Sequence, residues 1–443
     1  MTSMSRNWRL ETDANVSMIS NSIKGLICLF SIGLLFSNMF EAYFQQSFRL
    51  HLIATCAILF SLFFLQKSRI HKGVLIYVVV LSFYLANYYL FGPGDYRIVH
   101  VFTILIGVPL LYNVMVAANY SSREIWGLCK LLWTIIYITL LAEFFLVILG
   151  YQQSLYDIFP ESINRPKGLP AYRSFHNTFA FFLGLDYNGL NSIVLGIQAY
   201  GQLCVTLTVF SFKLAGRKIT EFIKSSILFI LLPVLMYVNS PNVTGAIVLV
   251  AIIVCSILVK QYIGIYSRPR TLLVISSAAL FAAAIFAADF GFVRRYDWGD
   301  FYLEYVYPQI AYVLTRTLSE SLIGVDLREF REIVDETEVG ILSYASAVGI
   351  VFAFLNLALL LHFMRRNLKQ IRTLYVRKLC KVDLLEVQIK NLLIIVAMLV
   401  SSIHFPVLFD FVVSFIFILS VAFCLYSVNA NTKILAGGAR SFT

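Results

Sequence analysis

Residues 243–263 read VTGAIVLVAIIVCSILVKQYI, a run in which the first charged residue is Lys260. A helix of about 20 apolar residues can cross a hydrocarbon core of about 30 Å. Similar runs recur along the chain, which has 443 residues and is 59% hydrophobic. The pattern predicts an all-α polytopic membrane protein with about twelve transmembrane helices. The predicted spans are 23–44, 50–66, 74–91, 98–118, 125–150, 191–212, 219–238, 243–263, 271–289, 339–363, 387–404 and 411–428.

Positive charge is distributed unevenly between the two sides of this bundle. Twelve spans place both termini on one side, and that side carries 25 of the 35 Lys and Arg residues. Because Lys and Arg accumulate in cytoplasmic segments, both termini are predicted to be cytoplasmic. The net charge of +11 is then a topology signal, and no nucleic-acid partner is expected. The segment 364–390, predicted as a cytoplasmic loop, holds eight of these residues: Arg365, Arg366, Lys369, Arg372, Arg377, Lys378, Lys381 and Lys390.

Two segments on the opposite side are much longer than the other connectors. Long loops on one face of a rigid scaffold are where binding and catalytic residues concentrate. One stretch of the second loop, FYLEYVYPQIAYVLTRTL at 301–318, is amphipathic and is predicted to lie along the membrane surface. The predicted organisation is helices one to five in 1–150, a first long outer loop in 151–190, helices six to nine in 191–289, a second long outer loop in 290–338, and the last three helices with a cytoplasmic tail in 339–443.

The first outer loop contains a cationic stretch without carboxylates. Residues 164–184 read NRPKGLPAYRSFHNTFAFFLG and carry Arg165, Lys167, Arg173 and His176. Arginine suits oxyanions because its planar guanidinium donates two parallel hydrogen bonds to a phosphate. An anionic ligand at the membrane surface, such as a lipid-linked diphosphate, fits this stretch. Phospholipid head groups or carboxylates of the second loop are the structural alternative.

The cysteines predict neither a disulfide nor a metal site. All seven fall in predicted spans or on the cytoplasmic side, without a CxxC spacing. The sequence also lacks a Walker loop and a dinucleotide-binding fingerprint. No cofactor and no metal are expected.

The cationic stretch resembles a loop-to-helix signature of the Wzy-type O-antigen polymerases, in the superfamily that also contains the O-antigen ligases. In RPKGLPAYRSFHNTFAFFLGL, residues 165–185, Arg165 and Gly168 precede the His176–Asn177 pair and an apolar segment. Arg173 is followed by Gly184 with the Arg-x10-Gly spacing of the long periplasmic loops in these polymerases.

The second outer loop carries the other half of the resemblance. ESLIGVDLREF at 320–330 is similar to the glycine turn before the last conserved block of the superfamily, with Asp326 in place of its second glycine. In DETEVGILSYASAVGI at 335–350, Gly340 and Gly349 follow the spacing of the segment that re-enters the membrane. The ligase-type histidine would fall near Glu338, and 290–338 contains no histidine. The resemblance therefore favours a polymerase over a ligase.

This resemblance implies an inverting, metal-independent glycosyltransferase of the bacterial inner membrane. It would join oligosaccharide repeat units carried on undecaprenyl diphosphate, which serve as donor and acceptor, beside membrane lipids and a partner that regulates chain length. Arg165 and Arg173 are the expected diphosphate ligands, supported by Lys167 and Arg328. The candidate general bases are Glu338 and, second, His176.

Two other functions stay open. One is a ligase that moves finished glycan onto a lipid A core, and the other is a lipid-linked oligosaccharide flippase or transporter. Flippases bury ionisable groups within several spans, whereas Glu143 is the one carboxylate found at depth in a predicted span here. The long outer loops and the scarcity of charge at depth favour an enzyme.

Overall fold

The computed structural model describes six longer stretches of the chain and several isolated helical residues. The longer stretches are 98–117, 203–214, 243–269, 306–317, 340–404 and 411–437. The isolated positions are 25, 76, 79, 127, 130, 131, 133–138, 141, 142, 145, 276, 303, 322 and 324. Every regular element in these residues is a helix, and they contain no strand, which confirms an all-helical architecture for this part of the chain.

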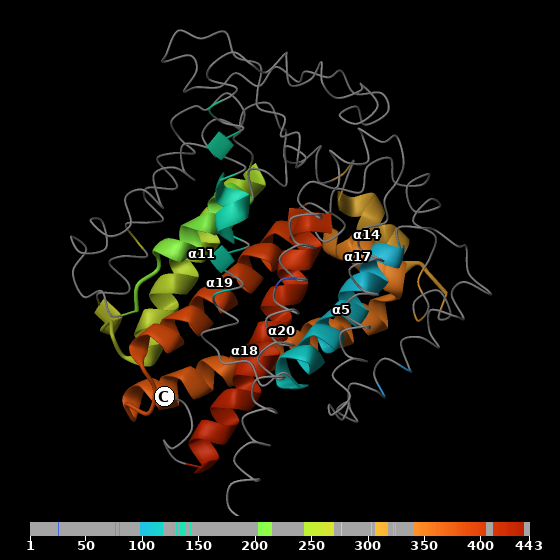
Figure 1. Ribbon diagram of the computed structural model, residues 1–443. Helices are drawn as coiled ribbons and strands as arrows, with labels where there is room; N and C mark the ends of the chain where they lie inside the picture. The colour runs from blue at the N-terminus through green and yellow to red at the C-terminus, as the bar shows by residue number, and fades with distance from the viewer. Residues whose placement is uncertain are drawn as a thin grey trace, which may run out of the picture.

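The described helices form one packed bundle (Figure 1). In chain order they are α5 Ile98–Ala117, the 3-10 helix η1 Leu207–Ser211, α11 Val243–Ile263, α14 Tyr307–Leu314, α17 Gly340–Val348, α18 Ile350–Val376, α19 Val382–His404 and α20 Phe411–Gly437. Helix α19 lies between α11 and α20, while α5 and α18 both pack against α20. Helices α14 and α17 contact each other beside α5.

Three of these helices are long and apolar enough to cross a membrane: Ile350–Val376, Val382–Ile403 and Ile416–Ala436. Shorter apolar helices occupy Ile106–Val116 and Ile247–Ile263. These helices support the predicted membrane character of the chain. Of the other predicted spans, most residues lie outside the described part, so the number twelve stays a prediction.

The core of the bundle is apolar and tightly packed. Ile395 and Ala397 of α19 and Phe423 of α20 are completely buried. Helices α5 and α20 approach closely at Gly107, where an added Cβ would lie 3.1 Å from Cδ1 of Ile418. A glycine at this position therefore lets the two helices pack closely.

The structure corrects the predicted loop at 364–390. Helix α18 continues to Val376 and α19 begins at Val382, so only a short connector separates them. The cationic segment is helical because its opposite face is buried at helical spacing, through Asn367, Gln370, Ile371 and Leu374. Lys378, at φ 53°, reverses the chain in the connector.

A second correction concerns charge within the spans. Glu386 and Lys390 lie in α19 and are buried, inside a helix that can cross the membrane. Glu386 is thus a buried carboxylate within a candidate span, which the sequence prediction did not include. The prediction hid this pair because it assigned both residues to the cytoplasmic loop 364–390.

The predicted span 339–363 is interrupted. Helix α17 ends at Val348, and Gly349 adopts φ 84° before α18 begins at Ile350. Residues with a Cβ rarely adopt such a backbone conformation, so the break depends on glycine.

Candidate functional site

The candidate residues chosen from the sequence lie outside the described part of the chain. They are Arg165, Lys167, Arg173, His176, Arg328 and Glu338, and Glu143 lies outside it as well. Their mutual geometry is therefore untested. The structure does describe Gly324 and Gly340, which flank Arg328 and Glu338 in the sequence.

Helix α14 lies in the segment that the sequence predicts as the second outer loop. Pro308 lies in its first turn, where the missing N–H of proline removes no helical hydrogen bond. Its buried side chains are Gln309, Tyr312 and Val313, and it packs against α17. The sequence predicted an amphipathic helix in this stretch, and the structure confirms the helix. Its predicted position along the membrane surface stays a prediction.

Arg316 is held at the end of α14 by an aromatic ring. Its guanidinium lies 3.5 Å from the centre of the Tyr312 ring, which is a close cation–π contact. Arg316 is the one cation of 290–338 among the described residues. A guanidinium positioned in this way is suited to contact an oxyanion.

Gly324 marks a turn that the sequence pattern singled out. It is buried and has φ 93°, a conformation that favours glycine. This is the glycine that matches the turn preceding the last block of the polymerase and ligase superfamily. The backbone conformation explains why a glycine is needed here.

Helix α17 follows this predicted outer loop and is packed on several sides. It contacts α5, α14, α18 and α19, and its Ser343 and Ser346 are buried. After the break at Gly349, α18 starts a new helix, and the first amides of a helix have no intrahelical acceptors. A helix start carries a partial positive charge and can stabilise an anion.

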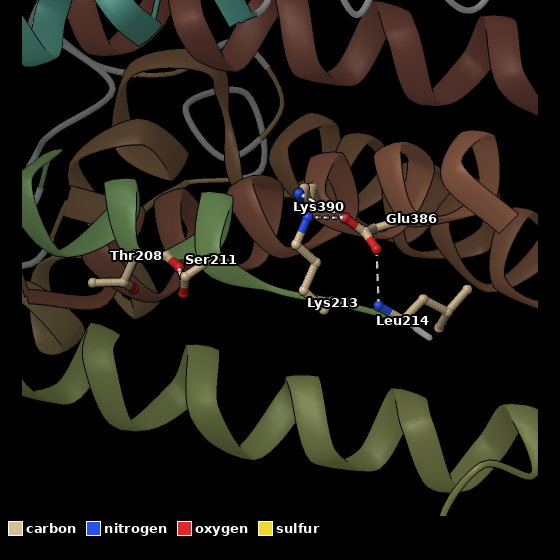
Figure 2. Close-up of polar contacts among 6 residues, drawn as sticks. All are labelled: Thr208, Ser211, Lys213, Leu214, Glu386 and Lys390. Atoms are coloured by element: carbon tan, nitrogen blue, oxygen red, sulfur yellow. Dashed lines mark hydrogen bonds and ion pairs between the residues drawn. The ribbon is translucent and has the colours of Figure 1, made fainter. Parts of the chain in front are cut away.

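A polar centre surrounds the Glu386 carboxylate (Figure 2). Its Oε2 accepts a hydrogen bond of 3.0 Å from the Leu214 backbone N–H. Its Oε1 lies 2.9 Å from Nζ of Lys390, one turn further along α19, and 3.8 Å from Nζ of Lys213. The carboxylate thus links the chain after η1 to α19.

This arrangement fits an anchor better than an acid–base catalyst. Both carboxylate oxygens of Glu386 already have partners, and the Lys390 side chain is only 9% exposed. The neighbouring hydroxyls of Thr208 and Ser211 donate to the backbone carbonyls of Val205 and Thr208. Figure 2 shows Thr208 and Ser211 set apart from the ion pair of Glu386 and Lys390.

A third lysine reaches the same segment from α11. Nζ of the buried Lys260 lies 5.2 Å from the ring centre of Phe212 and 5.4 Å from that of Tyr266. Aromatic faces stabilise a desolvated ammonium. Residues 212–214 therefore connect α11 with α19 through charged side chains.

Another polar centre consists of amide side chains and joins α18, α19 and α20. Asn431 Nδ2 donates to Gln388 Oε1 and to Asn367 Oδ1, at 2.9 and 3.3 Å. Asn391 donates to the Ser420 carbonyl at 2.7 Å. This network was not predicted from the sequence, in which its signal is the presence of Asn and Gln within otherwise apolar helical runs.

Within the described ranges, no three His, Cys, Asp or Glu side chains come together in a way that could hold a metal ion. Of the described cysteines, Cys204, Cys255, Cys380 and Cys424 are not joined in disulfides. The buried polar side chains of this part are mainly the hydroxyls of Ser and Thr and the amides of Asn and Gln, and its buried charged residues are Lys260, Glu386 and Lys390.

Comparison with protein-family models and with curated proteins finds no match for this chain.

Proposed function

We propose that this chain is a twelve-span glycosyltransferase of the bacterial inner membrane, with both termini in the cytoplasm. It polymerises repeat units carried on undecaprenyl diphosphate into O-antigen or a related surface polysaccharide at the periplasmic face. The resemblance of the two outer loops to Wzy-type polymerases supports this proposal. A protein that regulates chain length is an expected partner.

The structural observation that carries the proposal is the helix break at Gly349. In membrane proteins, interrupted helices direct the amides of a helix start towards anionic groups of the substrate. Here the break follows the second outer loop, in which Tyr312 holds Arg316. A diphosphate leaving group requires such positive partners, because catalysis depends on charge that is already positioned.

The proposed reaction is a direct displacement with inversion. A hydroxyl oxygen of the acceptor unit forms a bond to the anomeric carbon of the growing glycan, while the bond from that carbon to the diphosphate breaks. The hydroxyl proton passes to a base, Glu338 or, as second choice, His176. The products are a glycan longer by one unit on its carrier and free undecaprenyl diphosphate.

The cations of both outer loops have a defined role in this reaction. Arg165 and Arg173 bind the diphosphate, and Lys167 and Arg328 add positive charge around it. Fixed guanidinium groups can neutralise the leaving group without a metal ion.

The test is the glycan made by a deletion strain. Loss of a polymerase leaves single repeat units on lipopolysaccharide, because ligation continues without elongation. Bare lipid A core in the deletion strain would overturn the proposal.

The site assignment is tested by complementing this strain. Arg173→Ala is expected to abolish the ladder of chain lengths at normal membrane abundance. Arg268→Ala removes an exposed cation close to the end of α11 and should retain the ladder. An intact ladder with Arg173→Ala would remove Arg173 from the site.

One observation favours a flippase as the second candidate. The buried Glu386–Lys390 pair lies within a helix that can cross the membrane, and ionisable groups in such positions often mark transport pathways. Loss of a flippase leaves bare core and no polymer on the outer leaflet. Loss of a ligase also leaves bare core, but polymer accumulates on its carrier.

A further inference from the structure

Helix α18 exposes a face that changes from apolar to cationic along its length. In the first half, the exposed side chains include Val351, Phe354, Leu355 and Leu361, and Phe354 is 69% exposed. Within the described part of the chain, little covers this half of the helix. Phe354 and Leu355 follow Val351 by three and four positions, and Leu361 follows Phe354 by seven positions, or about two turns, so these residues share one side of the helix.

The same side of the helix continues with positive charge. Arg365, Lys369 and Arg372 follow Leu361 at the same three- and four-residue spacing, and Arg366 lies next to them. All four cations are exposed, whereas Asn367 and Ile371 on the other side are buried. We call the apolar residues together with the four cations the α18 stripe.

Among the described residues, little negative charge lies near the positive half of the stripe. Asp383 and Glu386 are the two carboxylates in the described part of the chain, and Glu386 is paired with Lys390. Arg372 lies over the Tyr262 ring at 4.8 Å, which positions it beside α11. An anion from outside the described residues would complement Arg365, Arg366 and Lys369.

The dimensions match one leaflet of a bilayer. With a rise of about 1.5 Å per residue, the helix advances about 16 Å from Phe354 to Arg365. Half of a hydrocarbon core of about 30 Å is about 15 Å. A lipid whose phosphate reaches Arg365 therefore has acyl chains of the right length to cover the apolar half.

We propose that the α18 stripe binds an anionic phospholipid, with its phosphate at Arg365, Arg366 and Lys369 and its acyl chains along Phe354 to Leu361. Basic residues next to the end of a spanning helix attract anionic head groups. The apolar half favours a lipid over a nucleic acid or free phosphate as the ligand, because those anions would contact only the cations. The inference does not depend on the proposed polymerase activity.

The test uses the full-length protein purified in detergent and titrated with dioleoyl phosphatidylglycerol or dioleoyl phosphatidylcholine. Bound lipid is counted by native mass spectrometry. Phosphatidylglycerol should bind more tightly than phosphatidylcholine, and R365Q/R366Q/K369Q should weaken its binding by about tenfold or more. The matched control R268Q/R377Q/K433Q removes three exposed cations outside the stripe and should change binding less than about twofold.

Each alternative result overturns the proposal. Equal binding of the two lipids would show that the head-group charge is not recognised. An equal effect of the two triple variants would show that only total charge matters. Competition by glycerophosphoglycerol, which lacks acyl chains, at the same concentration would show that the site recognises a free anion.

Discussion

The side-chain amides of Gln388 and Asn431 bond to each other in both directions. Asn431 donates to Gln388 at 2.9 Å, and Gln388 donates back to Asn431 at 3.2 Å. This pair connects α19 to α20 in the interior of the bundle, and a further bond from Asn431 to Asn367 includes α18. In an apolar interior, neutral amides satisfy each other without the desolvation penalty of charges.

Asn431→Ala should therefore destabilise the bundle by about 1–2 kcal/mol, because Gln388 and Asn367 lose a buried partner. Thermal unfolding of the purified protein measures this effect. Thr373→Ala is the control, since its hydroxyl bonds locally to the Lys369 carbonyl on the surface. The double variant Asn431→Leu/Gln388→Leu should be more stable than Asn431→Ala; a further loss of stability would contradict the role assigned to the pair.

Glu386→Gln should destabilise the protein by about 3–5 kcal/mol, because it leaves the buried Lys390 ammonium without its carboxylate. Lys213→Gln should cost less than about 1 kcal/mol, since the Lys213 side chain is 45% exposed and more distant. The comparison uses thermal unfolding at equal protein concentration. Similar losses in the two variants would show that Glu386 does not act mainly through Lys390.

Gly107→Val should destabilise the contact between α5 and α20 by about 1–3 kcal/mol, because the added carbon atoms press on Ile418. The double variant Gly107→Val/Ile418→Ala, in which the neighbouring side chain is shorter, should recover part of the lost stability. Gly127→Val is the control, since a Cβ at Gly127 meets nothing within 4 Å. If the double variant is no more stable than Gly107→Val, overpacking at this contact is not the cause.

Gly349→Ala should cost about 1–3 kcal/mol, because a φ of 84° strains a residue that carries a Cβ. Under the proposed function it should also shorten the ladder of chain lengths, since the start of α18 moves. Unfolding of the purified protein and the glycan profile of the complemented strain are read together. Gly127→Ala, in an open helical position, should leave both unchanged. A stable variant with a normal ladder would exclude a requirement for glycine at the break.

The sequence predicted those helices whose stability depends only on an apolar run in a bilayer. Helix α11 has the predicted bounds, 243–263, because an uninterrupted apolar run is stable as a helix in a bilayer whatever its neighbours are. Gly324 and Gly349 were also identified from the pattern, and both have the positive φ that favours glycine. The six predicted site residues stay predictions, since they lie outside the described part of the chain.

The boundaries of α18 and α19 could not be predicted in the same way. The many cations of residues 364–390 predicted a loop. The opposite face, with Ile371 and Leu374, is buried because α18 packs against α20, and this packing is not visible in the sequence. The role of Glu386 could not be predicted either, because the Leu214 N–H that donates a hydrogen bond to its carboxylate lies 172 residues away in the sequence.

By itself, the sequence determined the helical class and the membrane character, because both follow from local hydrophobicity and backbone hydrogen bonding. Only the tertiary structure decided which polar side chains share the interior. The Glu386–Leu214 hydrogen bond and the Asn431–Gln388 pair join segments that are distant in the sequence, so both depend on how these segments pack.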